Sequence, residues 1–225
     1  MTILITALYA EGRTDERFLP VVLQRTLVHL LGQYSNRVVD VWQPMVVKPD
    51  QKSSRVEDIL AVARKAPGAH LMFIHSDADH PTRTRALSER VLPGISLVQE
   101  RLIAGEAVCR DLIPVIPVQK VEAWMLADPD ALRATIGTIL SPGELGIPIR
   151  AHEIEGEAQP KERLTAIMRT AYAQRTQRRR SVDIGDLYQP LADQIRLEKL
   201  SQLPAYRQLI SDITTALTSL GFISS

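Results

Sequence analysis

Cysteine is nearly absent from this sequence: Cys109 is the single one among 225 residues. One cysteine excludes an internal disulfide and a cysteine-based zinc cage within the chain, and it suits a reducing cytoplasm. No apolar run approaches the ~20 residues that a membrane span requires, and the apolar start lacks the basic leader and the small-residue cleavage site of a secretory signal. We therefore expect a cytoplasmic protein that does not enter a membrane.

A strong charge imbalance is also missing. The chain carries 27 basic and 26 acidic residues, which gives a formal net charge of +1. Any surface that binds nucleic acid must therefore be local, because the whole chain is not basic. The apolar content of 45% is that of an ordinary globular protein, and the length allows one main core with a smaller appendage.

Short apolar runs alternate with amphipathic stretches through the first 130 residues. This alternation predicts an α/β fold with a mainly parallel sheet and right-handed crossover helices. Pro114 and Pro117 restrict the run around them to a sheet edge or an irregular segment, and Pro93 with Gly94 predicts a break in a helical stretch. The expected strands are 3–9, 38–47, 71–76 and 112–118, and the expected helices are 15–31, 56–65 (capped by Ser53 or Ser54), 82–92, a stretch toward Ala104, and 120–127.

From residue 141 the composition and the hydrophobic pattern of the chain change. Proline and glycine pairs mark loops, and the remainder is helical in pattern and more basic. We expect a metal-binding α/β domain over residues 1–140 and a helical C-terminal extension over 141–225 that packs on it. The helix candidates in the extension are 161–174, 184–200 and 205–220.

Carboxylates follow two of the expected strands. The apolar run 71–76 ends at Asp77 and Asp79, and Glu11 follows the first strand. In open α/β sheets, ligands bind outside the carboxyl ends of the strands, so the three side chains should meet at one edge. Ionised groups near a core need a cation or donors, and hard oxygen ligands of this type suit Mg²⁺ or Mn²⁺ together with phosphate oxygens. The sequence therefore predicts a divalent-metal site for phosphate chemistry.

Four segments, in this order and spacing, carry a resemblance to a known family. They are Tyr9-Ala-Glu-Gly-Arg-Thr-Asp-Glu-Arg-Phe-Leu19, Asp77-Ala-Asp79, Val118-Gln-Lys-Val-Glu-Ala-Trp-Met-Leu-Ala-Asp128 and Pro160-Lys-Glu-Arg-Leu164. Together they resemble an uncharacterised bacterial TOPRIM-like family related to the nuclease domain of overcoming-lysogenization-defect (OLD) proteins. The resemblance covers most of the chain, with the TOPRIM-like core in residues 1 to about 130.

This resemblance implies a Rossmann-like, metal-dependent domain that cuts phosphodiester bonds in DNA or RNA, often beside an ATPase partner in defence against phage. Water would attack phosphorus while one or two metals stabilise the attacking and leaving oxygens. Lys161, or else Lys120, would offset charge on the phosphoryl oxygens. Self-association is left open. The acids that match the family's metal-binding positions are Glu11, Asp15, Asp77, Asp79 and Glu122.

Each of these acids also has an ordinary structural explanation. Asp77 and Asp79 could end a strand and cap the next helix, since aspartate is common in turns. Asp15 suits the positive end of a helix dipole. Glu11 could be a solvated turn residue, and Glu122 a surface residue of a helix.

Two further features have a structural and a functional interpretation. His75 and His80 flank the aspartate pair and could bind a transition metal, but a hydrogen-bonded or exposed histidine is the simpler expectation. The arginines between 175 and 180 could grip a nucleic-acid backbone. They equally suit a solvated linker, because no aromatic residues for base stacking lie among them.

The motifs of other protein classes fit this sequence less well. Haloacid-dehalogenase-type phosphatases place Asp-x-Asp after the first strand and want threonine or valine where this chain has Pro81. No phosphate-binding loop of the G-x-x-x-x-G-K-[ST] type precedes Asp77, which argues against a P-loop ATPase. Glycosyltransferases with Asp-x-Asp do not account for Glu11. A second class stays open, namely a non-catalytic TOPRIM-shaped partner or regulator of an ATPase.

Overall fold

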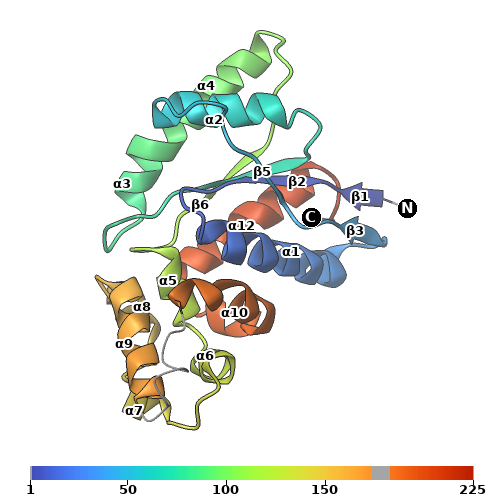
Figure 1. Ribbon diagram of the computed structural model, residues 1–225. Helices are drawn as coiled ribbons and strands as arrows, with labels where there is room; N and C mark the ends of the chain where they lie inside the picture. Colours follow the sequence, from blue (N-terminus) through green and yellow to red (C-terminus); the bar gives the residue numbers. More distant parts are fainter. Residues whose placement is uncertain (1, 174–182, 225) are drawn as a thin grey trace. The chain divides into compact units, whose positions relative to one another are not determined.

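The computed structural model describes residues 2–173 and 183–224 and has a mixed α/β fold (Figure 1). Sheets of parallel strands are flanked by helices, and the C-terminal part is helical, which confirms the predicted fold class. The chain divides into two compact units. The first comprises Met1–Ser76, Thr84–Ile116 and Gln208–Ser225, and the second comprises Asp77–Arg83 and Pro117–Arg207.

The first unit contains the parallel sheets. One sheet pairs two strands, β1 with β3, and the other has four strands in the order β4-β2-β5-β6. The strands are β1 (Thr2–Leu4), β2 (Thr6–Tyr9), β3 (Val39–Val41), β4 (Met45–Val46), β5 (Leu71–His75) and β6 (Leu112–Val115).

The central strand β5 is buried along its whole length. Its residues are apolar apart from the last, as expected for a parallel strand that is covered on both faces. Tyr9 of β2 pairs in register with Ile74 of β5, so the two strands end at the same carboxyl edge. Strand β6 lies at the sheet edge, where Pro114 is tolerated, as the sequence predicts.

Helices cover the sheet of the first unit on both faces (Figure 1). Helices α2 and α4 pack against each other, and α1 lies on the opposite face. Ser54 caps α2 with a reciprocal hydrogen-bond pair to Glu57, as expected for one of the two serines. The helical elements are α1 (Asp15–Tyr34), α2 (Arg55–Lys65), α3 (Thr84–Ala86), the π-helical turn η1 (Leu87–Val91), α4 (Leu92–Ile103) and the end of α12 (Pro204–Ser219).

The predicted break at Pro93 and Gly94 is wrong. Helical structure runs from α3 through η1 into α4, with Pro93 in the first turn of α4, where a missing N–H is harmless. Gly94 is needed for close packing, because a Cβ at this position would lie 2.5 Å from Cδ1 of Ile59 in α2. The glycine therefore marks a helix contact rather than a helix end.

The second unit is helical. Its core includes Trp124, whose ring packs edge-on against the ring of Tyr206 at 5.3 Å between centroids. Asp128 is fully buried, caps α6 and accepts hydrogen bonds from both the backbone and the guanidinium of Arg196. The elements are α5 (Val121–Met125), α6 (Pro129–Ile136), α7 (Pro142–Leu145), α8 (Ala151–Gly156), α9 (Pro160–Tyr172), η3 (Ile184–Asp186), α10 (Tyr188–Gln194), α11 (Leu197–Leu200) and the start of α12.

Further differences from the predicted elements concern boundaries. The first strand is divided at Ile5 into β1 and β2, which join different sheets. The expected helix over 184–200 is three short helical segments. Packing groups residues 117–140 with the second unit and 208–225 with the first, which differs from a single boundary near 140. The arginines between 175 and 180 lie outside the described residues.

Among residues 2–173 and 183–224, no helix is both long enough and apolar enough to cross a bilayer.

Candidate functional site

Glu11 lies at the carboxyl edge of the sheet in the first unit, two residues beyond the end of β2. Its Oε1 accepts a hydrogen bond from the hydroxyl of Ser76 at 3.0 Å, and its backbone N–H donates to Nδ1 of His75 at 3.4 Å. His75 is the last residue of β5, and Ser76 follows it directly. The Glu11 carboxylate is therefore held where β5 ends, beside the residue that precedes Asp77 in the chain.

Asp15 organises the turn that carries Glu11. It is buried in the first turn of α1, and its Oδ2 accepts the backbone N–H of Gly12 at 2.9 Å. The same oxygen lies 3.6 Å from Nδ1 of the fully buried His75. Asp15 thus has the structural role that its place in a first turn suggests, and His75 is a hydrogen-bonded core histidine, as expected.

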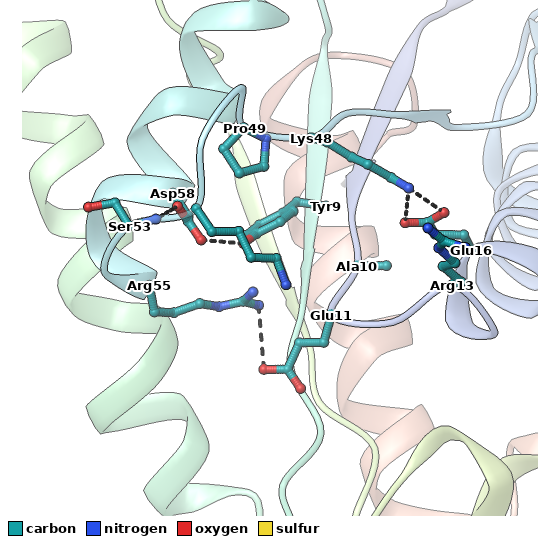
Figure 2. A pocket seen from close by; sticks show the side chains of 11 residues that line it. Tyr9, Ala10, Glu11, Arg13, Glu16, Lys48, Pro49, Ser53, Arg55 and Asp58 are labelled. Atoms are coloured by element: carbon teal, nitrogen blue, oxygen red, sulfur yellow. Dashed lines mark hydrogen bonds and ion pairs between the residues drawn. The ribbon is translucent and has the colours of Figure 1, made fainter.

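Arg55 of α2 brings a positive charge to Glu11, and sequence reasoning missed it. Its Nη2 lies 4.0 Å from Oε1 of Glu11 and donates to the backbone oxygen of His75. Its guanidinium also stacks over the ring of Tyr9, 4.4 Å from the centroid. Figure 2 shows this guanidinium pointing toward the carboxylate of Glu11. Arg55 is thereby fixed from three directions.

Tyr9 connects the end of β2 to α2. Its hydroxyl donates to Oδ2 of the buried Asp58 at 2.9 Å, and Oδ1 of Asp58 accepts the backbone N–H of Ser53 at 2.9 Å. Burial raises the pKa of Tyr9 to about 12; the nearby Asp58 adds to the rise and the Arg55 guanidinium opposes it. Tyr9 is therefore a neutral donor that holds α2 and Arg55 in place.

A cavity of about 600 Å³ opens beside Glu11 in the first unit (Figure 2). Its size is within the usual range for small-ligand sites, and its lining is mostly polar or charged. Lys48 on its wall forms an ion pair with Glu16, with an Nζ to Oε1 distance of 2.7 Å. The lining residues are Tyr9, Ala10, Glu11, Arg13, Glu16, Lys48, Pro49, Lys52, Ser53, Arg55 and Asp58.

Asp77 and Asp79 belong to the second unit, in a loop with unusual backbone geometry. Asp79 and Gln119 both have positive φ, 48° and 58°; aspartate adopts this region more readily than most residues, whereas glutamine rarely does. The N–H of Asp79 donates to the backbone oxygen of Gln119 at 2.9 Å, which ties the two strained positions together. Strain of about 1–3 kcal/mol per residue is found preferentially at functional sites, so the loop is a candidate on backbone grounds as well.

The aspartate side chains in this loop have partners in the second unit. Oδ1 of Asp77 accepts the backbone N–H of Val121 at 3.2 Å, at the start of α5. Oδ1 of Asp79 lies 3.7 Å from Nζ of Lys120. Asp77 therefore accepts a hydrogen bond from the start of a helix, but that helix is α5 and not α3, the next helix along the chain that the sequence allowed it to cap.

The two least specific residue matches lie elsewhere in the second unit. Glu122 is buried, and its Oε1 accepts the hydroxyl of Tyr188 at 2.5 Å. It is not the surface residue that the simpler interpretation expected. Lys161 is exposed at the start of α9.

The predicted metal ligands are divided between the units. Glu11 and Asp15 belong to the first unit, and Asp77, Asp79 and Glu122 belong to the second. Within residues 2–173 and 183–224, no group of three or more histidine, cysteine, aspartate or glutamate side chains is arranged to hold a metal ion. The carboxylate oxygens of the five predicted ligands are of the type that Mg²⁺ and Mn²⁺ prefer. That these five residues bind a metal stays a prediction.

Residues 10–213 match the model of one protein family, Domain of unknown function (DUF4276). The chain belongs to this family. The DUF4276 match contains every candidate residue from Glu11 to Lys161, but the family's description assigns no activity, so the resemblance to TOPRIM-like nucleases stays a prediction. Comparisons with curated proteins and with solved structures found no match.

Sequence reasoning found Glu11 in this DUF4276 chain because a turn after a strand leaves a local pattern. It missed Arg55 and Ser76, which contact Glu11. Arg55 lies 44 positions from Glu11, and only the packing of α2 beside β2 and β5 brings the two together. Ser76 had a weak signal, since it directly precedes Asp77.

Proposed function

We propose that this protein is a divalent-metal-dependent phosphodiesterase that acts on nucleic acid, with Glu11, Asp77 and Asp79 as the metal ligands. The hydrogen bond between Ser76 and Glu11 carries the proposal. This bond fixes the Glu11 carboxylate at the end of β5, the strand that the chain leaves through Ser76 before it reaches Asp77 and Asp79.

The surroundings of Glu11 suit phosphate chemistry. A bound Mg²⁺ or Mn²⁺ would neutralise phosphate charge and stabilise the attacking and leaving oxygens of the reaction. Arg55, fixed over Tyr9 and 4.0 Å from Glu11, supplies a preorganised positive charge for the phosphoryl oxygens. Lys120, beside Asp79, is a second such cation. Lys161 has the same proposed role, supported by the resemblance alone.

The resemblance also supports the biological setting of the proposal. It suggests that the protein acts together with an ATPase partner in defence against phage. Co-purification with the product of an adjacent ATPase gene, if the genome has one, would test this part.

Metal binding is tested first by thermal unfolding with and without Mg²⁺ or Mn²⁺. A ligand at 100 times its Kd stabilises the folded state by about 2.7 kcal/mol, which corresponds to a rise in Tm of about 5–10 °C at this size. We expect this rise in the wild type and its loss in Glu11→Gln, Asp77→Asn and Asp79→Asn. Glu100→Gln, an exposed acid on α4, is the matched control and should keep it.

Cleavage is tested with labelled single-stranded and double-stranded DNA and RNA in the presence of each metal, with a chelator as the blank. Each of the three ligand variants should lower the rate by about a hundredfold or more, as typically follows from loss of a charge-stabilising group. A folded Asp77→Asn that cleaves at the wild-type rate would refute the assignment. Wild-type protein that shows no metal shift at millimolar Mg²⁺ or Mn²⁺ would favour a non-catalytic regulator of an ATPase.

A further inference from the structure

The cavity beside Glu11 has more positive charge than its own acids neutralise. Four cationic side chains, Arg13, Lys48, Lys52 and Arg55, share its lining with three carboxylates. Glu16 is engaged by Lys48 and Glu11 by Arg55. The third carboxylate, Asp58, accepts hydrogen bonds from a tyrosine hydroxyl and a backbone amide. Each carboxylate of the cavity therefore already has an ion-pair or hydrogen-bond partner within the first unit.

Two of the cations have no such partner. In the described part of the chain, the side chains of Arg13 and Lys52 make no ion pair or hydrogen bond with any residue. Arg13 follows β2, and Lys52 lies in the loop between β4 and α2, so they reach the cavity from different segments of the first unit. Two unpaired cations on the wall of one cavity favour an anionic ligand.

The lining also indicates which part of a nucleic acid would enter. Tyr9 is the aromatic residue among those that line the cavity, and the Arg55 guanidinium covers a face of its ring. Base recognition on single strands relies on open aromatic faces, whereas arginine and lysine recognise phosphate. A phosphate group, rather than a base, fits this chemistry.

We propose that the cavity is a subsite for a phosphomonoester at the end of a nucleic-acid strand. Arg13 and Lys52 bind the phosphate, and Arg55 adds a third positive charge to the lining. A phosphomonoester carries about −1.5 to −2 charges at neutral pH, which matches two unpaired cations better than a diester does. Since the cavity includes Glu11, a strand end bound there has its first linkage near the proposed reaction centre. This placement rests on the proposed function, but binding of the terminal phosphate does not.

The test measures binding of the full chain to short, internally labelled single strands by fluorescence anisotropy in a chelator, so that no cleavage occurs. The strands carry a 5′-phosphate, a 3′-phosphate or no terminal phosphate. We expect one phosphorylated strand to bind about tenfold more tightly than the unphosphorylated strand, because two charged contacts near the surface each add a modest amount. Arg13→Gln and Lys52→Gln should each reduce that difference several-fold.

Arg110→Gln is the matched control. Arg110 is an exposed arginine of the first unit just before β6, at the opposite edge of the sheet, and its substitution should leave the difference intact. Equal binding of all three strands, or a difference that both cavity variants retain, would overturn the subsite. Inorganic phosphate or a nucleoside monophosphate that binds as tightly as the strand end would assign the cavity to a free small molecule instead.

Binding and cleavage separate the two proposals. Preference for a terminal phosphate without metal-dependent cleavage in any assay supports the subsite and counts against the phosphodiesterase. Cleavage that is metal-dependent but indifferent to terminal phosphate, with equal binding of the strands, supports the phosphodiesterase and overturns the subsite.

Discussion

The contact between Glu122 and Tyr188 allows the role of Glu122 to be tested with a single hydroxyl. Tyr188 is fully buried, and its hydroxyl donates to Oε1 of Glu122 at 2.5 Å. No other hydrogen bond to the Glu122 carboxylate occurs within the described ranges. Tyr188→Phe removes this donor while it keeps the ring and therefore the packing. The variant leaves a buried carboxylate with a lost partner.

The size of the stability loss in Tyr188→Phe depends on the charge of the acceptor, the Glu122 carboxylate. A hydrogen bond to an ionised group contributes about 1.5–3 kcal/mol, against about 0.5–1.5 kcal/mol between neutral groups. We therefore expect Tyr188→Phe to lower the free energy of unfolding by about 2–3 kcal/mol. Tyr172→Phe is the matched control in the same unit, because the hydroxyl of the buried Tyr172 donates to a neutral acceptor, the backbone oxygen of Ile136, at a longer 3.3 Å. Its loss should be about 1 kcal/mol or less.

Chemical denaturation of the wild type and both variants measures these differences, and a metal titration of each completes the experiment. If Glu122 is a structural acid, Tyr188→Phe lowers stability and leaves the rise of Tm with Mg²⁺ unchanged. Equal losses for the two tyrosines would refute the reasoning about the charged acceptor. Loss of the Mg²⁺ effect in a folded Tyr188→Phe would return Glu122 to the metal site.

Three further predictions concern stability and reactivity. Gly94→Ala forces a Cβ against α2 and should lower the free energy of unfolding, measured by chemical denaturation, by about 1–3 kcal/mol. Its control is Gly32→Ala on α1, where a Cβ meets open space, and this variant should leave the free energy of unfolding unchanged or raise it by up to about 1 kcal/mol. Burial alone would raise the pKa of the Asp128 carboxyl, but its arginine partner and the α6 amide hold it below its usual value. The stability this adds is present above the ordinary pKa of about 3.9 and is lost as pH falls through the lowered folded-state pKa. Asp128→Asn should therefore have a lower free energy of unfolding at pH 7 than the exposed control Asp130→Asn. Unfolding curves measured at decreasing pH should show this difference between the two variants becoming smaller. Burial raises the pKa of Cys109 to about 11, so the native thiol should react with iodoacetamide far more slowly at pH 8 than the unfolded thiol.

Much of the fold could be predicted because parallel strands leave a strong local signal. Strand β5 is a continuous apolar run that stops on polar residues, and a strand covered on both faces must have that composition. The place of Glu11 followed from the same rule, since chains that leave neighbouring parallel strands emerge at one edge. The break expected at Pro93 failed because proline in a first turn is compatible with a helix, and sequence alone did not distinguish a first turn from an interior.

The role of an acid is harder to predict than its position, because it depends on which donors reach it. Glu11, Asp15, Asp77 and Glu122 have similar chemistry in the sequence, yet their carboxylates meet a serine hydroxyl, a turn amide, a helix amide and a tyrosine hydroxyl respectively. The donors to Asp15 and Glu122 belong to a local turn and to a buried core, and such contacts suffice to explain an acid without any ligand. Glu11 differs, because beside its serine it faces the fixed guanidinium of Arg55 at the wall of a charged cavity. An acid and a cation held together at a strand end, in reach of a cavity with unpaired positive charge, is an arrangement that a structural role alone does not require. That contrast makes Glu11, ahead of the other acids, the residue on which a phosphate-directed function depends.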